Sequence, residues 1–159
     1  MKACYFYEGA IGKYGLQESG GKLTRIWVGD RVAAVPDGCE RRETPLLREA
    51  RRQLDAYFDR RLKTFELPYL LDGTPFQQKV WHALCDIPYG ICITYGELAA
   101  LIGDPKACRA VGMANGRNPL PIIVPCHRVI GSGGKLTGYT GGLDIKTKLL
   151  QIEGITLFG

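Results

Sequence analysis

The segment that defines this 159-residue chain is Asn118-Pro119-Leu120-Pro121-Ile122-Ile123-Val124-Pro125-Cys126-His127-Arg128-Val129-Ile130. Prolines interrupt an apolar run that predicts a strand, and this run contains a cysteine directly followed by a histidine. Neighbouring side chains on a regular strand point to opposite faces. Contact between Cys126 and His127 therefore needs an irregular backbone, which Pro125 makes feasible, or else a water that relays a proton.

This Cys-His pair has two interpretations. A thiolate is a strong nucleophile, and a neighbouring base or cation makes it available by lowering the pKa of the thiol. A carboxylate elsewhere in the chain, such as Glu153, could orient the imidazole as the third member of a relay. A buried structural cysteine beside a hydrogen-bonded histidine is the commoner arrangement, so the dipeptide alone does not decide between the two.

Two short helices are predicted on the N-terminal side of this segment. Thr94-Tyr95-Gly96-Glu97 is a capping box that opens the first helix, and Gly103 ends it. Asp104-Pro105 predicts the start of the second helix, which runs to Ala114. A helix pair joined by so tight a turn is typical of helix-turn-helix proteins, although many helical bundles contain it without contacting DNA.

The second of these helices combines small residues with one long cation, Arg109. Small side chains let a helix backbone approach a bulky partner closely, and nucleic acid is one such partner. Close packing between two helices would be served equally well, and a surface arginine is more often only a solvated charge. The small residues are Ala107, Ala110, Gly112, Ala114 and Gly116.

Further helices are predicted on either side of this region. Thr74-Pro75-Phe76-Gln77 is a capping box that precedes an apolar stripe at helical spacing. Residues 131–142 are rich in glycine, and Asp144 is predicted to cap a last helix that ends near Glu153-Gly154.

The N-terminal part predicts an α/β unit. Gly20-Gly21 predicts a turn, Gly29-Asp30 predicts a hairpin, and Thr44-Pro45 predicts the start of a helix with a solvated, arginine-rich face. Charge density falls near Asp72-Gly73, so we place a domain boundary there, between residues 1–72 and 73–159. The predicted strands are Cys4–Tyr7, Leu23–Val28 and Arg31–Val35.

Composition and charge limit the class of protein. Hydrophobic residues make up 45% of the chain and charged residues 23%, which is typical of a folded domain. No run approaches the ~18 apolar residues of a membrane span, and the first residues lack the apolar core of a secretory signal. The 21 Lys and Arg against 16 Asp and Glu give a net charge of +5, which permits nucleic acid as a partner without requiring it.

The chain has six cysteines and only two histidines, His82 and His127. No two cysteines form a C-x-x-C pair, so zinc-finger and zinc-ribbon spacings are absent. Nothing in the sequence suggests export, and we therefore expect free thiols in a reducing, cytoplasmic setting.

The segment around Cys126 resembles the active-site signature of the O6-alkylguanine-DNA alkyltransferases, also called methylated-DNA–protein-cysteine methyltransferases. The resemblance covers roughly residues 70–155, in order and without large gaps. Earlier residues match the family only loosely, through Ile11-Gly12 and Gly20-Gly21-Lys22-Leu23. The matching motifs are Phe76-Gln77-Gln78-Lys79-Val80-Trp81, Ile87-Pro88-Tyr89-Gly90, Thr94-Tyr95-Gly96-Glu97-Leu98-Ala99, Arg109-Ala110-Val111-Gly112, Asn118-Pro119, Pro125-Cys126-His127-Arg128-Val129 and Gly138-Tyr139-Thr140-Gly141-Gly142-Leu143.

The resemblance implies a fold, a partner and a reaction. It implies an N-terminal α/β domain similar to ribonuclease H over 1–72, and a mainly α domain with a winged helix-turn-helix over 73–159. Such a protein binds double-stranded DNA containing alkylated guanine through the minor groove and flips the damaged base into a pocket. A cysteine then takes the alkyl group irreversibly, so a monomer without a cofactor repairs DNA once per molecule. Whether O4-alkylthymine is also a substrate is left open.

Five positions match the reacting machinery of the family. Cys126 matches the alkyl acceptor, His127 the residue that deprotonates it through a water, and Glu153 the carboxylate that steadies the histidine. Tyr95 matches the phenol that protonates or hydrogen-bonds the guanine. Asn118 matches the residue that braces the turn holding the active site.

Further positions match contacts with the substrate or with DNA. Arg109 matches the finger that fills the place of the flipped nucleotide, and Ala110 and Ala114 belong to the small-residue face of the same helix. Tyr139 and Thr140 match the pocket wall, with the backbone N–H of Thr140 directed at the guanine oxygen. The carbonyl groups that match acceptors for the guanine amino group are those of Cys126 and Val129.

The chain departs from parts of the family pattern. Some members hold a structural zinc through Cys and His in the N-terminal domain, but no histidine precedes His82 here, so we predict no metal. Asn115-Gly116-Arg117 stands where some members carry a bulkier apolar residue, which should alter the fit of the helix to the groove. Cys126 favours an enzyme over a pure binding module that senses damage or regulates transcription. A cysteine hydrolase is the other alternative, and the sequence shows no oxyanion-hole motif for it.

Overall fold

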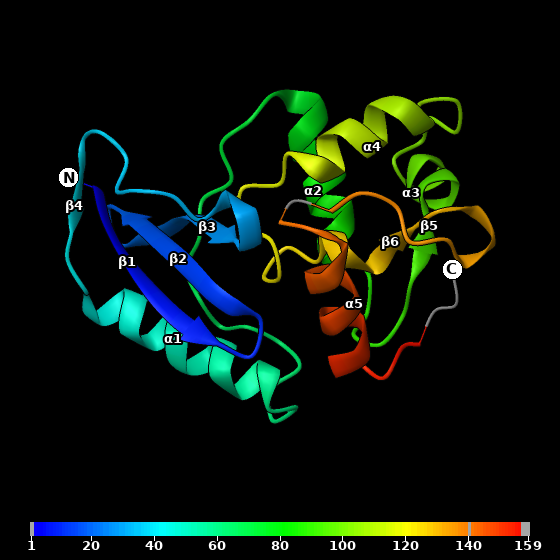
Figure 1. Cartoon of the computed structure of the whole chain (residues 1–159). Helices are drawn as coiled ribbons and strands as arrows, with labels where there is room; N and C mark the ends of the chain where they lie inside the picture. Colours follow the sequence, from blue (N-terminus) through cyan, green and yellow to red (C-terminus); the bar gives the residue numbers. More distant parts are fainter. Residues whose placement is uncertain (1, 140, 157–159) are drawn as a thin grey trace.

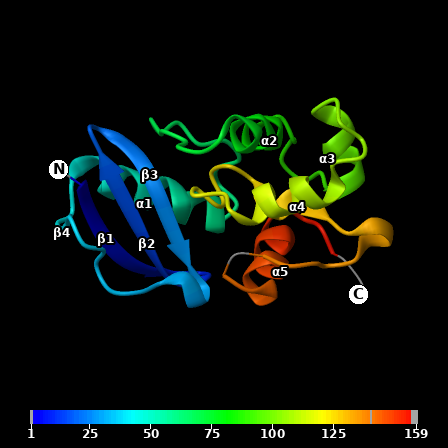
Figure 2. The same cartoon turned by 90° about the horizontal axis from the view of Figure 1, so that it is seen from above.

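The computed structural model describes residues 2–139 and 141–156. Its N-terminal part is a four-stranded sheet with one helix packed against it, and its C-terminal part is a group of helices with a two-stranded sheet (Figure 1). Seen from above, the two parts lie side by side, and the yellow segment near residue 120 runs between them (Figure 2). The protein is thus a small α/β protein with a mixed sheet.

The N-terminal sheet has the strand order β3-β2-β1-β4. The first three strands form an antiparallel meander, and the short last strand pairs in parallel with β1. The predicted turn at Gly20-Gly21 joins β2 and β3. The strands are β1 (Lys2–Gly9), β2 (Gly12–Ser19), β3 (Lys22–Val28) and β4 (Cys39–Arg41).

One amphipathic helix, α1 (Pro45–Phe58), packs on this sheet. It begins as predicted: the Thr44 hydroxyl accepts the N–H of Leu47, and Pro45 occupies the first turn, where its missing N–H is harmless. Arg48 and Arg52 on its outer face are exposed and pair with nearby glutamates, so the solvated arginine face is confirmed.

The predicted hairpin at Gly29-Asp30 and the predicted strand Arg31–Val35 are wrong. The chain instead makes a short 3-10 turn, η1 (Gly29–Arg31), and leaves the sheet. The open edge of β3 is already occupied, because Leu23 exchanges backbone hydrogen bonds with residues 68–70 and Ile26 donates to the carbonyl of Pro119 at 2.9 Å. No partner edge therefore remains for another strand at this position.

Strand β2 was not predicted because its hydrophobic pattern does not alternate. It is the central strand of the meander, and four consecutive residues, 14–17, are buried. Gly15 leaves room on one face for the rings of Phe6 and Trp27. A strand covered on both faces and containing glycine lacks the period-two signal that identifies half-exposed strands.

The C-terminal part is built from four helices and short extended segments. Both predicted capping boxes are confirmed, because the Thr74 and Thr94 hydroxyls each accept an N3 backbone N–H while the N3 side chain returns to the cap. The elements are α2 (Pro75–Cys85), β5 (Ile93–Thr94), α3 (Tyr95–Leu101), α4 (Cys108–Gly116), η2 (Cys126–Arg128), β6 (Val129–Ile130), η3 (Ser132–Gly134) and α5 (Leu143–Ile152).

Three details of this part correct the sequence prediction. Helix α4 begins at Cys108 rather than at Asp104, and α5 is preceded by Gly142, with Asp144 inside its first turn. The segment 118–130 is mostly irregular rather than a strand; its last two residues pair in parallel with β5, and Pro121 and Val124 form an isolated bridge. Its three prolines supply no N–H for a ladder, and Ile122 has a φ of 78°.

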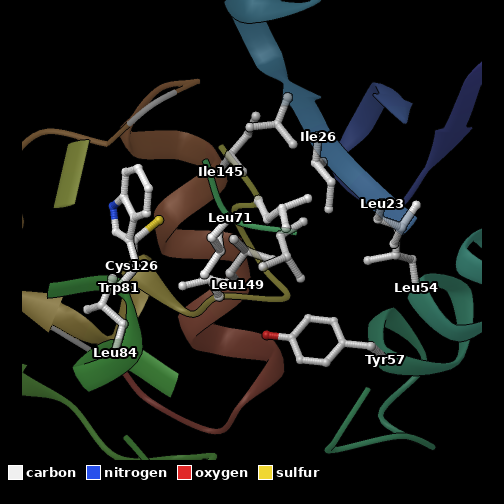
Figure 3. Close-up of a cluster of buried hydrophobic side chains, with 14 of the residues drawn as sticks. Leu23, Ile26, Leu54, Tyr57, Leu71, Trp81, Leu84, Cys126, Ile145 and Leu149 are labelled. Atoms are coloured by element: carbon white, nitrogen blue, oxygen red, sulfur yellow. The ribbon is translucent and has the colours of Figure 1, made fainter. Parts of the chain in front are cut away.

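One hydrophobic core joins the two parts of the molecule. Leucines from β3 and α1 meet side chains of α2 and α5 in a single cluster (Figure 3). Tyr57 from α1 extends toward the C-terminal helices in the same view. No helix among residues 2–139 and 141–156 has the length and apolar character needed to cross a membrane.

An alanine at Gly29 should destabilise the protein. The residue has a φ of 56°, and an added Cβ would overlap the carbonyl oxygen of Gly141 and lie 2.7 Å from Cδ1 of Ile145. Because backbone strain and steric overlap act together, we expect the free energy of unfolding to fall by about 2–4 kcal/mol in a urea titration.

The matched control is Gly20→Ala. Gly20 has a φ of 60°, but nothing lies within 4 Å of an added Cβ. The free energy of unfolding of Gly20→Ala should fall by only about 1–2 kcal/mol, which is the cost of placing an alanine in the left-handed backbone conformation. Equal losses at the two positions would show that the contact between Gly29 and Gly141 does not constrain the fold.

Candidate active site

The cysteine of the candidate site lies in the 3-10 turn η2, directly after Pro125. Cys126 is 2% exposed and belongs to the same buried cluster as Trp81 (Figure 3). Burial raises the pKa of the thiol to about 11, although a hydrogen bond from Asn118 and the charge of Lys146 act in the opposite direction. The resting group at neutral pH is therefore a thiol, and a base is needed to make it a nucleophile.

The histidine next to this thiol is held by a buried carboxylate. His127 Nε2 lies 2.6 Å from Glu153 Oε2, and both side chains are fully buried. Burial lowers the pKa of His127 despite the carboxylate beside it, so the imidazole is neutral at pH 7. A neutral ring must donate its Nε2–H to the carboxylate, which leaves the lone pair on Nδ1. That atom is buried and has no hydrogen-bond partner within the described part of the chain.

The carboxylate of Glu153 is the centre of a larger network. Arg128 donates to it twice, at 2.8 and 3.1 Å, and also donates to the carbonyl of Ile87. The hydroxyl of Tyr57 donates at 2.5 Å, and the N–H of Gly90 donates at 3.0 Å. Burial alone would raise the pKa of Glu153, but hydrogen bonds from His127 and Arg128 outweigh it and hold that pKa well below its usual range.

A cavity of about 550 Å³ opens between α3, α4 and the segment that precedes α5. We call it the acceptor cavity; Tyr95, Arg109, Gly112, Thr137 and Tyr139 line it, together with Arg31 from the N-terminal part. Thr137 donates its hydroxyl hydrogen to the phenol oxygen of Tyr95 at 3.2 Å.

Tyr139 joins the acceptor cavity to the thiol. Its ring lines the cavity, and its buried hydroxyl lies close to the thiol of Cys126. Burial raises the pKa of Tyr139 well above 10, and proximity to Cys126 contributes to the same shift. Cys126 itself does not line the cavity, so its sulfur lies behind Tyr139.

Asn118 and Lys146 secure the backbone around the thiol. The Asn118 side-chain amide donates to the carbonyl of Val124 at 2.7 Å, and its oxygen accepts the N–H of Leu120. Lys146 is buried and donates to the carbonyls of Val129 and Thr137, at 2.7 and 3.0 Å. The two side chains thereby fix both the Cys126 turn and the segment that carries Tyr139.

The structure gathers most, but not all, of the predicted site residues. Arg109 and Ala110 are exposed on α4, as a DNA contact requires. Ala114 corrects the prediction, because it is 3% exposed and its carbonyl accepts the indole N–H of Trp81. The helical period turns position 114 toward the core while 109 and 110 face out. Thr140 lies outside the described residues.

No cluster of three His, Cys, Asp or Glu side chains that could hold a metal ion exists among residues 2–139 and 141–156. The absence of a structural zinc remains a prediction from the sequence. The cysteines are free thiols, as expected.

Comparison with known proteins decides the family. Residues 75–155 match the family described as 6-O-methylguanine DNA methyltransferase, DNA binding domain. The matched region is more than half of the chain and contains the whole Cys126-His127-Glu153 array. The chain belongs to the methylated-DNA–protein-cysteine methyltransferases.

Similar proteins cover nearly the whole chain. The methylated-DNA–protein-cysteine methyltransferase of Methanosarcina acetivorans is 56% identical over 86% of this chain and 87% of its own length. The constitutive enzyme of Bacillus subtilis is 49% identical over 94% and 93%. A crystal structure of Mycobacterium tuberculosis OGT in complex with DNA superposes with a TM-score of 0.89 at 44% identity, covering 95% of this chain and 92% of that one. This methyltransferase is therefore a DNA-binding enzyme of DNA repair.

Sequence reasoning missed three residues of this methyltransferase site. Lys146 lies next to Ile145 on the buried face of α5, which also includes Leu149. A lysine on the buried face of an amphipathic helix is unusual, and this was the signal that could have identified it. Arg128 was noted only as a neighbour of the cysteine. Tyr57 gave no signal, because it occupies an ordinary core position of α1.

Proposed function

We propose that Cys126 takes the alkyl group of O6-alkylguanine in duplex DNA, irreversibly and once per molecule. The observation that carries the proposal is the buried Cys126-His127-Glu153 array beside a cavity large enough for a base. In a one-step displacement the sulfur–carbon bond forms as the carbon–oxygen bond breaks, and guanine leaves. Nothing removes the resulting thioether, so the molecule is spent.

The proposed base for the thiol is the free Nδ1 of His127, acting through a water. A neutral imidazole with an unshared lone pair has the form that a general base needs. The carboxylate of Glu153 then stabilises the imidazolium that forms, since its pKa keeps it ionised. Because burial raises the pKa of Cys126, the nucleophile would form only during transfer.

The proposed acid for the leaving guanine is Tyr95. Thr137 donates to the Tyr95 oxygen, so the phenol proton remains available for the base. We place Tyr139 and Thr140 in the pocket wall and assign the carbonyls of Cys126 and Val129 to the guanine amino group. Lys146 already donates to the Val129 carbonyl, which therefore would use its second lone pair.

The proposed route to the cavity is base flipping from the minor groove. Helices α3 and α4 with the glycine-rich segment 131–138 support a winged helix-turn-helix, with α4 against DNA. The meander with α1 on one face supports a ribonuclease H-like unit over 1–72, beside a DNA-binding and acceptor unit over 73–159. Arg109, exposed at the cavity rim, is assigned to the gap that the base leaves.

Arg109→Ala should slow alkyl transfer from a stably paired base more than from a mismatched one. The arginine compensates for lost stacking, and a mismatch has already lost part of it. Single-turnover transfer rates on the two duplexes measure the difference. A matched control is Arg61→Ala, an exposed arginine whose partner is Asp59. Equal losses on both duplexes would contradict the assignment of Arg109.

The function is tested by mixing the protein with duplex DNA that contains O6-methylguanine. We expect the intact mass of the protein to rise by one methylene unit, with the peptide containing Cys126 carrying it, while unmodified duplex gives no change. Binding without a mass change would indicate a binding module. Peptide hydrolysis that depends on Cys126 would indicate a hydrolase. An O4-methylthymine duplex in the same assay tests whether that base is a second substrate.

We further propose that the protein acts as a monomer in the cytoplasm. Free cysteines, several of them exposed or partly exposed, support a reducing compartment. Sedimentation without DNA tests the oligomeric state, and a stable dimer would contradict it.

A further inference from the structure

A second groove, lined by three arginines, adjoins the acceptor cavity. It has a volume of about 370 Å³ and lies between β3 and the segment that follows α4. We call it the arginine groove, after Arg25 and Arg31 on the N-terminal side and Arg117 on the C-terminal side. Figure 2 shows β3 and the end of α4 facing each other across this segment.

These three arginines are exposed and lack acidic partners. No ion pair to Arg25, Arg31 or Arg117 occurs within residues 2–139 and 141–156. Four surface arginines on and around α1 behave differently, since each of them pairs with an aspartate or glutamate; they are Arg48, Arg51, Arg52 and Arg61. Positive charge is therefore neutralised around α1 and left uncompensated in the arginine groove.

The lining of the arginine groove contains no acidic side chain. The next hollow along the surface, which shares Arg25 and Pro119 with it, is lined by Asp72 as well as Lys2. The purely basic surface thus ends at Arg25. At its other end it meets the acceptor cavity, because Arg31 and Gly116 line both.

The two sides of the arginine groove are held at a fixed separation. The backbone N–H of Ile26 donates to the carbonyl of Pro119 at 2.9 Å, which ties β3 to the segment after α4. Arg25 also lies against a ring, with its guanidinium carbon 5.9 Å from the centre of the Trp27 ring. A preformed, unneutralised cationic groove favours an anionic partner and reduces the ordering cost of binding it.

We propose that the arginine groove binds the phosphodiester backbone of the duplex whose damaged base enters the acceptor cavity. The N-terminal part then shares in holding DNA, alongside the exposed face of α4. Guanidinium groups match phosphate oxygens in geometry and charge, and such contacts position DNA without reading its sequence. This inference rests on the proposed function, since it takes the DNA at the acceptor cavity as the occupant.

The test measures binding of undamaged duplex DNA against salt concentration. Arg25→Gln/Arg117→Gln removes one charge from each side of the arginine groove and leaves the lining of the acceptor cavity intact. Two lost phosphate contacts should flatten the slope of log affinity against log salt by about 2, and weaken binding roughly tenfold to a hundredfold at 0.1 M salt. Arg25→Gln alone should flatten the slope by about 1.

The matched control is Arg48→Gln/Arg52→Gln, which removes the same net charge from α1. These arginines line neither the acceptor cavity nor the arginine groove, and the control should keep the slope of the unmodified protein. Thermal unfolding of both double variants checks that each remains folded. Unchanged binding by Arg25→Gln/Arg117→Gln, or equal weakening by both double variants, would overturn the proposal. Because undamaged DNA is used, a failure of alkyl transfer would not be mistaken for a failure of the groove.

Discussion

Alkyl transfer should disappear completely in Cys126→Ala, while affinity for duplex DNA stays the same. The displacement needs a sulfur lone pair, and no other group replaces it at that position. DNA binding should survive because Cys126 is 2% exposed and does not line the acceptor cavity. Removing one buried atom should cost about 1 kcal/mol of stability.

The measurement is intact mass after incubation with O6-methylguanine duplex, combined with a binding titration. Cys4→Ala is the matched control, because Cys4 is also fully buried and burial likewise raises its pKa to about 11. Cys4 lies in β1, away from His127 and Glu153, so this variant should transfer normally. A mass gain in Cys126→Ala, or the absence of a mass gain in Cys4→Ala, would contradict the assignment of Cys126 as the alkyl acceptor.

Glu153→Gln should have the largest effect on stability. The neutral amide leaves Arg128 without its countercharge in a buried position, and removing one partner of a buried pair costs about 3–5 kcal/mol. Alkyl transfer should also fall by about 10²–10⁴-fold, because the imidazolium formed from His127 would no longer be stabilised. Urea unfolding and single-turnover transfer measure the two effects separately.

The same substitution should change how stability depends on pH. The folded-state pKa of Glu153 lies below its ordinary value of 4.5, because hydrogen bonds from His127 and Arg128 outweigh the opposing effect of burial. The stabilisation is therefore fully present above about pH 5, and it is lost as the pH falls toward the folded-state pKa. The difference in unfolding free energy between the two proteins should thus be constant near neutrality and shrink in acid.

Glu49→Gln is the control for this experiment. Glu49 forms a pair with Arg52 at 2.6 Å, the same distance as the Glu153–His127 contact, but it lies on the exposed face of α1. Solvent screens such a pair, so its loss should change stability little. If Glu153→Gln were as mild as Glu49→Gln, the buried network would not be what holds the active site together.

Local signals in the sequence were sufficient for several elements. The helix starts at Thr44, Thr74 and Thr94 depend on a hydroxyl and a backbone N–H three residues apart, so a short stretch of sequence contains all the interacting groups. The motifs around Cys126 predicted the family and named the Cys126-His127-Glu153 array. The start of α4 was predicted four residues early, because a Pro after Asp permits a helix start without compelling one.

Contacts between distant residues were decided by tertiary structure alone. Tyr57 and Glu153 are 96 residues apart and still share a hydrogen bond, and Arg128 reaches Glu153 and Ile87 at once. Such contacts leave no periodic pattern, because each depends on how two elements pack. The same holds for Arg31, which a 3-10 turn and an occupied β3 edge bring to the acceptor cavity. The sequence alone thus named the proposed reactive groups, and packing determined their burial and their hydrogen-bond partners.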